Sequence, residues 1–185
     1  QLMCLLKVMP QIETLQVWGR NANGMARYIE EVKHNYPSLH VIACPNAKSA
    51  VTNADIIYTV TYSDKPIIKA DWIKPGTHIT AVGACEPNMQ ELDEKILGIA
   101  DVVCTDSIDA CSKNGELHHA LENGFIKKDK VTELGAYISS KAKRNPADIT
   151  ICDLVGIGFQ DAVIASSVME EYARQKSCIN ANELK

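Results

Sequence analysis

The chain has 185 residues, of which 46% are hydrophobic and 23% charged, and its formal net charge is −4. This length allows one well-formed core, or one domain and part of a second. The small negative charge gives no reason to expect nucleic acid or an anionic membrane as a partner, and no apolar run approaches the about 18 residues that span a bilayer.

Short apolar runs alternate with helical patterns along the chain. Residues 2–9 have helical spacing and stop at Pro10, which resembles the last turns of a helix whose beginning is missing, so we expect a fragment. The expected strands are 14–18, 39–44, 55–61, 78–84, 101–106 and 148–155, and the expected helices are 22–35, 46–54, 89–100, part of 107–131, and 159–175. This alternation predicts an α/β fold with a mostly parallel sheet and helices on both faces.

Cysteine and histidine usage indicates the compartment and the absence of a metal site. The seven cysteines are an odd number without a C-x-x-C pair, and several lie inside strand-like runs. Reduced, mostly buried thiols in the cytoplasm are therefore expected, with neither a disulfide framework nor a zinc site. His118 and His119 lie on a polar helical stretch and are expected to face water, and we identify no metal-ligand constellation.

Ligands of open parallel sheets bind beyond the carboxyl ends of the strands. The residues that follow the expected strands are small, polar or glycine-containing, namely Gly19-Arg20-Asn21, Thr59-Val60-Thr61, Val82-Gly83-Ala84-Cys85 and Leu154-Val155-Gly156. We expect the site at these positions. No G-x-G-x-x-G loop is present, and the pair Gly156 and Gly158 is interpreted as close packing of a strand on a helix.

Several sequence blocks resemble those of the ornithine cyclodeaminase and mu-crystallin family. They are VWGR at 17–20, ADIIYTVTYSDKPII at 54–68, AVGACEPNMQELDEKIL at 81–97 and NPADITICDLVGIGFQDAVIA at 145–165. The resemblance implies a Rossmann-like, doubly wound domain over 1–158 that lacks its first strand and glycine-rich loop. It implies a C-terminal helix over 159–185 that returns toward an incomplete second domain for dimerisation and substrate binding.

The same resemblance implies that the pyrophosphate loop and the substrate-binding lysine and arginines of the family lie upstream. We therefore expect this chain to be inactive alone, and the full-length protein to be a homodimer.

The turn at Arg20 predicts the cofactor. An acidic residue at this point of a Rossmann sheet holds a ribose hydroxyl of NAD, whereas a guanidinium can bind a phosphate through two hydrogen bonds. We therefore expect NADP(H), with NAD(H) as the alternative, and Asn21 as a second ligand. The family pattern implies that Thr59 and Thr61 line the ribose and phosphates, that Ala81, Val82 and Gly83 back the nicotinamide, that Leu154 borders the cofactor, and that Val155 and Gly156 border the substrate.

Cys85 bears on the reaction. The cyclodeaminases of the family have a catalytic aspartate two residues before the proline of the AVG block, and here that position is Cys85. A thiol does not replace a carboxylate base near neutral pH, and the mu-crystallin-like ketimine reductases also lack the aspartate. Asp153 is a second catalytic candidate, or else a strand-end or capping residue.

The resemblance thus implies an NAD(P)H-dependent imine or ketimine reductase, or an amino-acid dehydrogenase, with hydride transfer at the α carbon of a small amino or imino acid. One alternative is ornithine cyclodeaminase, which forms proline and ammonia with NAD+ as a catalytic cofactor. The other is a non-catalytic NADP(H)-binding protein.

Overall fold

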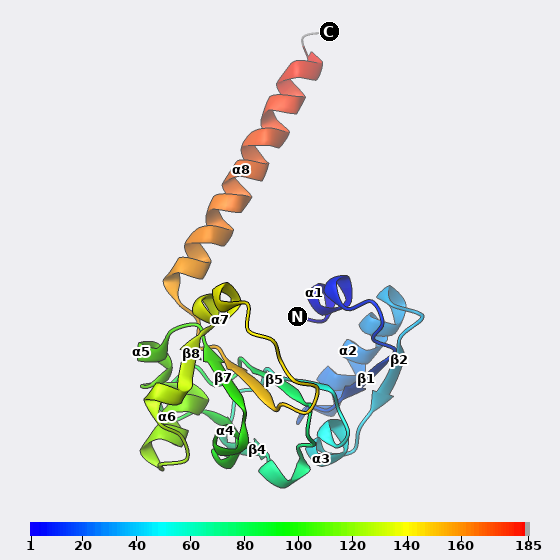
Figure 1. Ribbon diagram of the computed structural model, residues 1–185. Coiled ribbons are helices and arrows are strands. Elements are labelled where there is room, and N and C mark those ends of the chain that lie inside the picture. The colour runs from blue at the N-terminus through cyan, green and yellow to red at the C-terminus, as the bar shows by residue number, and fades with distance from the viewer. Residues whose placement is uncertain (184–185) are drawn as a thin grey trace.

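A five-stranded parallel sheet forms the centre of the molecule (Figure 1). The computed structural model describes residues 1–183, and side chains up to residue 175. The strand order is β3-β5-β9-β7-β8, and the bounds are β3 Ile56–Thr59, β5 His78–Ala81, β7 Val102–Thr105, β8 Val131–Glu133 and β9 Thr150–Asp153. All neighbours run parallel, which confirms the predicted doubly wound α/β architecture.

Two further strand pairs flank this sheet. β1 (Thr14–Val17) pairs in parallel with β2 (His40–Ala43), and β4 (Asp64–Ile68) pairs in parallel with β6 (Gln90–Leu92). Within the described residues, β1 has no hydrogen-bonded strand other than β2, and β3 has none other than β5. The β1–β2 pair therefore forms a separate sheet, at the right of Figure 1.

The helices follow the strands in the expected alternation. Their bounds are α1 Leu2–Val8, α2 Ala22–Asn35, α3 Ala47–Val51, α4 Lys95–Ile99, α5 Ile108–Cys111, α6 Gly115–Glu122, α7 Leu134–Ser140 and α8 Gly158–Glu183. Asparagine caps set two of the starts. The side chain of Asn21 accepts a hydrogen bond from Gly24 N at 3.0 Å, and that of Asn46 accepts one from Ser49 N at 2.9 Å, which satisfies amides that lack a partner in the first helical turn.

The core lies on one face of the five-stranded sheet. Register places one apolar residue of each strand in a row across the sheet, in the order Ile57, Ile79, Ile151, Val103 and Val131. All five are buried, and they pack with Leu92 of β6, Ile96 and Leu97 of α4, and Leu117 of α6. Burying one such aliphatic side chain contributes about 1.5–3 kcal/mol, so this row fixes which side of each strand faces inward.

Four elements differ from the sequence prediction. Residues 89–100 were expected to form one helix, but Gln90–Leu92 is strand β6 and only Lys95–Ile99 is helical. Strands β4 and β8 and helix α7 were not predicted. β4 contains Pro66 and begins with charged residues, and such short strands are stabilised by their neighbours rather than by their own propensity.

Gly156 and Gly158 also differ from the expectation of close packing. A Cβ built on either glycine would meet no atom within 4 Å. Gly156 instead has φ +83°, a left-handed backbone conformation that other residues adopt at a cost. The glycine serves the turn between β9 and α8.

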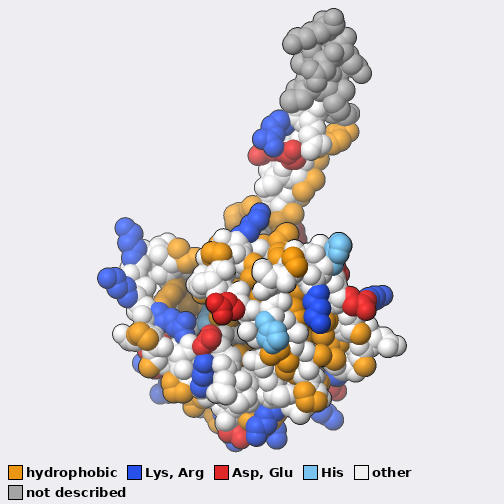
Figure 2. All heavy atoms as spheres, turned by 90° about the vertical axis from the view of Figure 1, so that its right-hand side faces the viewer, with side chains coloured by type: hydrophobic (Ala, Val, Ile, Leu, Met, Phe, Trp, Pro, Cys, Tyr) orange, Lys and Arg blue, Asp and Glu red, His pale blue; other side chains and the backbone are white. Residues whose placement is uncertain are grey.

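Helix α8 extends away from the sheet (Figure 1). Its described part carries exposed hydrophobic side chains, which include Phe159, Val163, Ile164, Val168 and Met169. Figure 2 shows orange surface on this helix below the grey tip. Among the described residues, every helix is too short or too polar to cross a bilayer.

Candidate functional site

The predicted site residues are brought to one edge of the sheet. The last residues of neighbouring strands lie in register, with Thr59 beside Ala81, Ala81 beside Asp153, and Asp153 beside Thr105. Because the strands are parallel, the loops that follow β3, β5 and β9 leave the sheet on the same side. The turn after β1 reaches this edge through the side chain of Arg20.

The guanidinium of Arg20 donates a hydrogen bond to the backbone carbonyl of Tyr62. This contact links the turn after β1 with the loop after β3, 42 residues later in the chain. Both residues are exposed. The guanidinium carries five N–H groups, and the backbone carbonyl accepts from only part of them. The remaining N–H groups of this exposed side chain are accessible from solvent.

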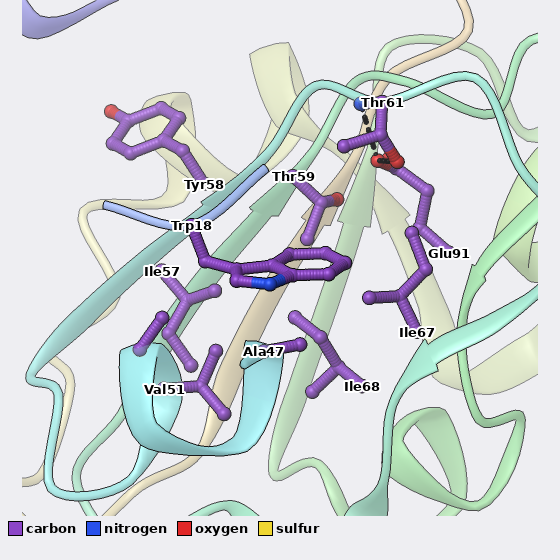
Figure 3. Close-up of a pocket in the computed structure, with 11 residues that line it drawn as sticks. Trp18, Ala47, Val51, Ile57, Tyr58, Thr59, Thr61, Ile67, Ile68 and Glu91 are labelled. Carbon is purple, nitrogen blue, oxygen red and sulfur yellow. Dashed lines mark hydrogen bonds between the residues drawn. The ribbon is translucent and has the colours of Figure 1, made fainter. Parts of the chain in front are cut away.

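Glu91 is a central residue of the site that the sequence prediction missed. Its Oε1 accepts hydrogen bonds from Thr61 N and Thr61 Oγ1, both at 2.6 Å, and its Oε2 accepts one from Gly83 N at 2.9 Å. Figure 3 shows Thr61 directed toward this carboxylate. The side chain is fully buried. Glu91 therefore clamps the loop after β3 to the loop after β5.

The small residues after β5 fit this clamp. A Cβ on Gly83 would lie 2.3 Å from the carbonyl oxygen of Thr61 and 2.5 Å from the carboxyl group of Glu91. Ala81 is 1% exposed and its side chain packs in the core, so this residue offers only its backbone to the edge. The Ala81 carbonyl accepts a hydrogen bond from Leu154 N at 2.9 Å, and Val82 N donates to the Thr59 carbonyl at 3.0 Å.

Two more buried carboxylates continue the network. Glu116 accepts from the backbone N–H groups of Glu91 at 2.7 Å and Leu92 at 3.0 Å, and Asp153 Oδ2 accepts from Leu117 N at 2.9 Å. Loss of solvation raises the pKa of Glu116 well above its ordinary range. Burial also raises the pKa of Asp153 to about 7, although the hydrogen bond from Leu117 opposes this shift.

The contacts of Asp153 are those of a capping residue. Its side chain is fully buried beneath the first turn of α6, where a carboxylate complements the helix dipole. The second oxygen, Oδ1, has no hydrogen-bond partner within the described part of the chain. Of the two interpretations of Asp153, the capping role is the one that this geometry favours.

A cavity of about 70 Å³ lies between the end of β1, helix α3 and strands β3 and β4 (Figure 3). The indole of Trp18 lies among Ala47, Val51, Ile57 and Ile68, and Thr59 points toward it from β3. The Thr59 hydroxyl is buried and has no hydrogen-bond partner among the described residues. A buried hydroxyl without a partner is costly, so this group is a candidate for contact with a ligand or with a further chain segment.

The remaining predicted residues are distributed between surface and interior. Cys85 is exposed four residues beyond β5, while Leu154 and Val155 are half-buried. Gly156 is exposed, and its N–H donates to Asp106 Oδ2 at 2.7 Å. The thiols of Cys44, Cys104, Cys111 and Cys152 are free and buried, whereas Cys4 is free and exposed like Cys85, so most of the described cysteines are reduced interior residues as expected. Cys178 lies outside the described side chains.

Comparison with known proteins gives the family. The model of the ornithine cyclodeaminase/mu-crystallin family matches residues 1–176. The chain belongs to this family. A relative named uncharacterized cyclodeaminase, from Sinorhizobium fredii, is 37% identical over 169 residues, which cover 90% of this chain and 50% of that protein. The ketimine reductase mu-crystallin of Macropus fuliginosus is 32% identical over 162 residues, 88% of this chain and 48% of its own.

The fold of the family is also evident in a solved structure. An archaeal alanine dehydrogenase dimer with bound NAD superimposes with a TM-score of 0.85 and 28% sequence identity, over 95% of this chain and 54% of that one. The chain thus spans about half the length of the curated ornithine cyclodeaminase/mu-crystallin relatives it matches.

Proposed function

We propose that the full protein is an NADP(H)-dependent imine or ketimine reductase, or an amino-acid dehydrogenase, that acts on a small amino or imino acid. A bound nicotinamide nucleotide would supply or accept the hydride at the α carbon of the substrate. The observation that carries the proposal is the position of Arg20, whose guanidinium lies where the loops after β1 and β3 meet.

Arg20 supports NADP(H) over NAD(H). No acidic residue is present among Gly19, Arg20 and Asn21, although a carboxylate at this turn is what holds the ribose hydroxyl of NAD in Rossmann folds. A guanidinium that is anchored by one backbone carbonyl keeps further donors for a phosphate. The side-chain oxygen of Asn21 caps α2, so only its amide N–H groups are available to the nucleotide.

The residues of β3 and β5 support a nucleotide at the same edge. The Thr59 hydroxyl, which has no hydrogen-bond partner among the described residues, would donate to a phosphate or ribose oxygen. Thr61 donates its hydroxyl proton to Glu91, so toward a ligand this hydroxyl can only accept, which suits a ribose hydroxyl better than a phosphate. Gly83 lets the Glu91 carboxylate approach, because a side chain at residue 83 would occupy its position. We propose that Ala81 and Val82 line the nucleotide through their backbone.

Cys85 supports a reductase over a cyclodeaminase. It is the exposed residue at the position where the cyclodeaminases have their catalytic aspartate, and we propose that it borders the substrate together with Leu154, Val155 and Gly156. Asp153 is buried and holds α6, so it is better suited to positioning the end of β9 than to proton transfer with substrate.

The test is a nucleotide titration of the full-length protein, followed by turnover of cyclic imines and of ornithine. Arg20→Ala should weaken NADPH binding at least about tenfold, which corresponds to about 1.4 kcal/mol, and should leave NADH binding within about twofold. Arg27→Ala, an exposed arginine on α2, is the matched control. Tighter binding of NADH than of NADPH would contradict the role of Arg20, and release of proline and ammonia from ornithine would identify a cyclodeaminase instead.

We further propose that the Rossmann-like domain ends at residue 158 and that the helix from residue 159 onward packs against a second domain or a second subunit. The exposed apolar side chains of α8 are suited to packing against a second domain or a second subunit. The alanine dehydrogenase relative is a dimer, which favours a homodimer for the full protein.

A further inference from the structure

The last turns of helix α6 bring His118, His119 and Glu122 together. One potential ligand atom from each residue lies within 4.8 Å of the other two. The spacing produces this arrangement, because Glu122 is four residues after His118 and three after His119, and both separations place side chains on neighbouring parts of a helix surface. The two imidazole rings have centroids 5.1 Å apart and are tilted by 58°.

The backbone fixes a different tautomer for each neutral ring. Nδ1 of His118 lies 3.2 Å from the carbonyl oxygen of Ser112, and Nε2 of His119 lies 3.0 Å from that of Met89. A carbonyl oxygen only accepts, so these two nitrogens carry the protons. The opposite nitrogens, Nε2 of His118 and Nδ1 of His119, are left with free lone pairs. Histidines that bind metals typically donate their second nitrogen to a backbone carbonyl or carboxylate in this way.

The free nitrogen of His118 faces a carboxylate. Its Nε2 lies 3.4 Å from Glu122 Oε2. Two lone pairs at this distance repel each other unless Nε2 binds a proton or both atoms bind a metal ion. The site also lies at the C-terminal end of α6, where the helix dipole favours positive charge. The expectation that both histidines face water is therefore wrong, since both rings are half-buried and hydrogen-bonded to backbone carbonyls.

We propose that His118, His119 and Glu122 bind one divalent transition-metal ion, with Zn²⁺ as the representative. Two imidazole nitrogens and one carboxylate oxygen suit zinc, nickel or copper and are poor ligands for Mg²⁺ or Ca²⁺. Three protein ligands leave a fourth coordination position for water. His118 has a side-chain exposure of 19% and Glu122 of 64%, so an ion can enter from solvent without unfolding α6.

The first experiment is histidine-detected NMR of the protein at pH 7.5. Without metal, His118 should give the Nδ1–H tautomer and His119 the Nε2–H tautomer. Addition of Zn²⁺ should shift Nε2 of His118 and Nδ1 of His119, while the exposed His34 and His40 remain unchanged. Earlier or equal shifts at His34 and His40 would overturn the proposal, and so would a pattern in which His118 is doubly protonated and insensitive to Zn²⁺.

The second experiment is calorimetry with Zn²⁺. The exposed thiols Cys4 and Cys85 are replaced by serine to prevent competing binding, as is Cys178. One ion should bind per chain, and His118→Gln and Glu122→Gln should each weaken binding at least about tenfold, as loss of a metal ligand or its support commonly does. His34→Gln, an exposed histidine in the last turn of α2, should leave affinity within about twofold. Unchanged affinity in His118→Gln and Glu122→Gln would overturn the site.

Discussion

The carboxylate of Glu91 lies beside Gly83, in the space that a side chain at residue 83 would need. The Cβ of an alanine there would be 2.5 Å from this carboxylate and 2.3 Å from the carbonyl of Thr61. Gly83→Ala should therefore separate the loops after β3 and β5 and lower both the Tm and the nucleotide affinity. Gly135→Ala is the control, because a Cβ on Gly135 would meet no atom within 4 Å. An unchanged Tm in Gly83→Ala would show that the clamp tolerates displacement.

Removal of the clamp itself should be more damaging. Glu91→Ala leaves Thr61 N, Thr61 Oγ1 and Gly83 N without their acceptor, and each unsatisfied buried donor costs about 1–3 kcal/mol. Chemical denaturation should show a loss of at least about 2 kcal/mol, and the KM for nucleotide should rise more than kcat falls. Glu86→Gln, an exposed glutamate in the loop after β5, should change neither quantity.

Thr59→Val separates stability from binding. The Thr59 hydroxyl is buried without a partner in the described residues, so valine should raise the Tm or leave it unchanged. If the hydroxyl contacts the nucleotide, the same variant should weaken nucleotide binding by about tenfold. A variant that binds nucleotide normally would remove Thr59 from the proposed site.

The buried carboxyls Glu116 and Asp153 should make stability fall as pH rises. The pKa of Asp153 is raised to about 7 from 3.8, and that of Glu116 is raised as well. The folded state therefore holds these protons at pH values where the unfolded state has lost them, and stability decreases between the unfolded and folded pKa values by at most about 1.4 kcal/mol per pH unit for each group. Above the folded pKa values this loss is complete.

Asp153→Asn tests this linkage, because the amide oxygen can still accept from Leu117 N. Denaturation between pH 5 and 8 should show a smaller decrease in stability for the variant than for the parent protein. His78, whose pKa burial lowers, contributes the opposite slope below its ordinary pKa, so the difference between variant and parent is the decisive quantity. Parallel pH profiles would contradict the raised pKa of Asp153.

Substitutions on the exposed face of α8 should affect dimer formation and leave the stability of the single chain nearly unchanged. Ile164→Ser and Val168→Ser replace side chains that are 64% and 61% exposed, so they should change the stability of this chain by less than about 0.5 kcal/mol. In the full-length protein, light scattering should show dissociation of the dimer if α8 lies at its interface. Gln160→Ser, on the same helix but polar, should leave the assembly intact.

Local patterns in the sequence identified most of the fold. The buried row through Ile57, Ile79, Ile151 and Val103 is visible as apolar runs, and the helix expected over 46–54 contains α3. The β4–β6 pair was missed because its stability depends on a partner strand far away in the sequence. The sequence of 89–100 by itself favours a helix, and only the pairing of Gln90–Leu92 with β4 shows that its first part is a strand.

The site was predicted only in outline. The order of the expected strands was enough to place Arg20, Thr61, Gly83 and Cys85 in the loops that follow the strand ends, and their roles in a site are predictions. Glu91 was missed because it looks like an ordinary acidic residue of a helix, and only the fold shows that its carboxylate is buried between two loops. The available signal was a glutamate directly before the apolar Leu92 and two residues after the apolar Met89.

The separate β1–β2 sheet has a practical consequence. One edge of β1 and one edge of β3 present backbone N–H and C=O groups that no other described strand binds. Exposed strand edges of this kind pair with strands from other molecules. The chain produced by itself should therefore be prone to aggregation during concentration. For the same reason, a separate synthetic peptide of β-forming sequence should improve the solubility of the chain by pairing with the free edges of β1 and β3.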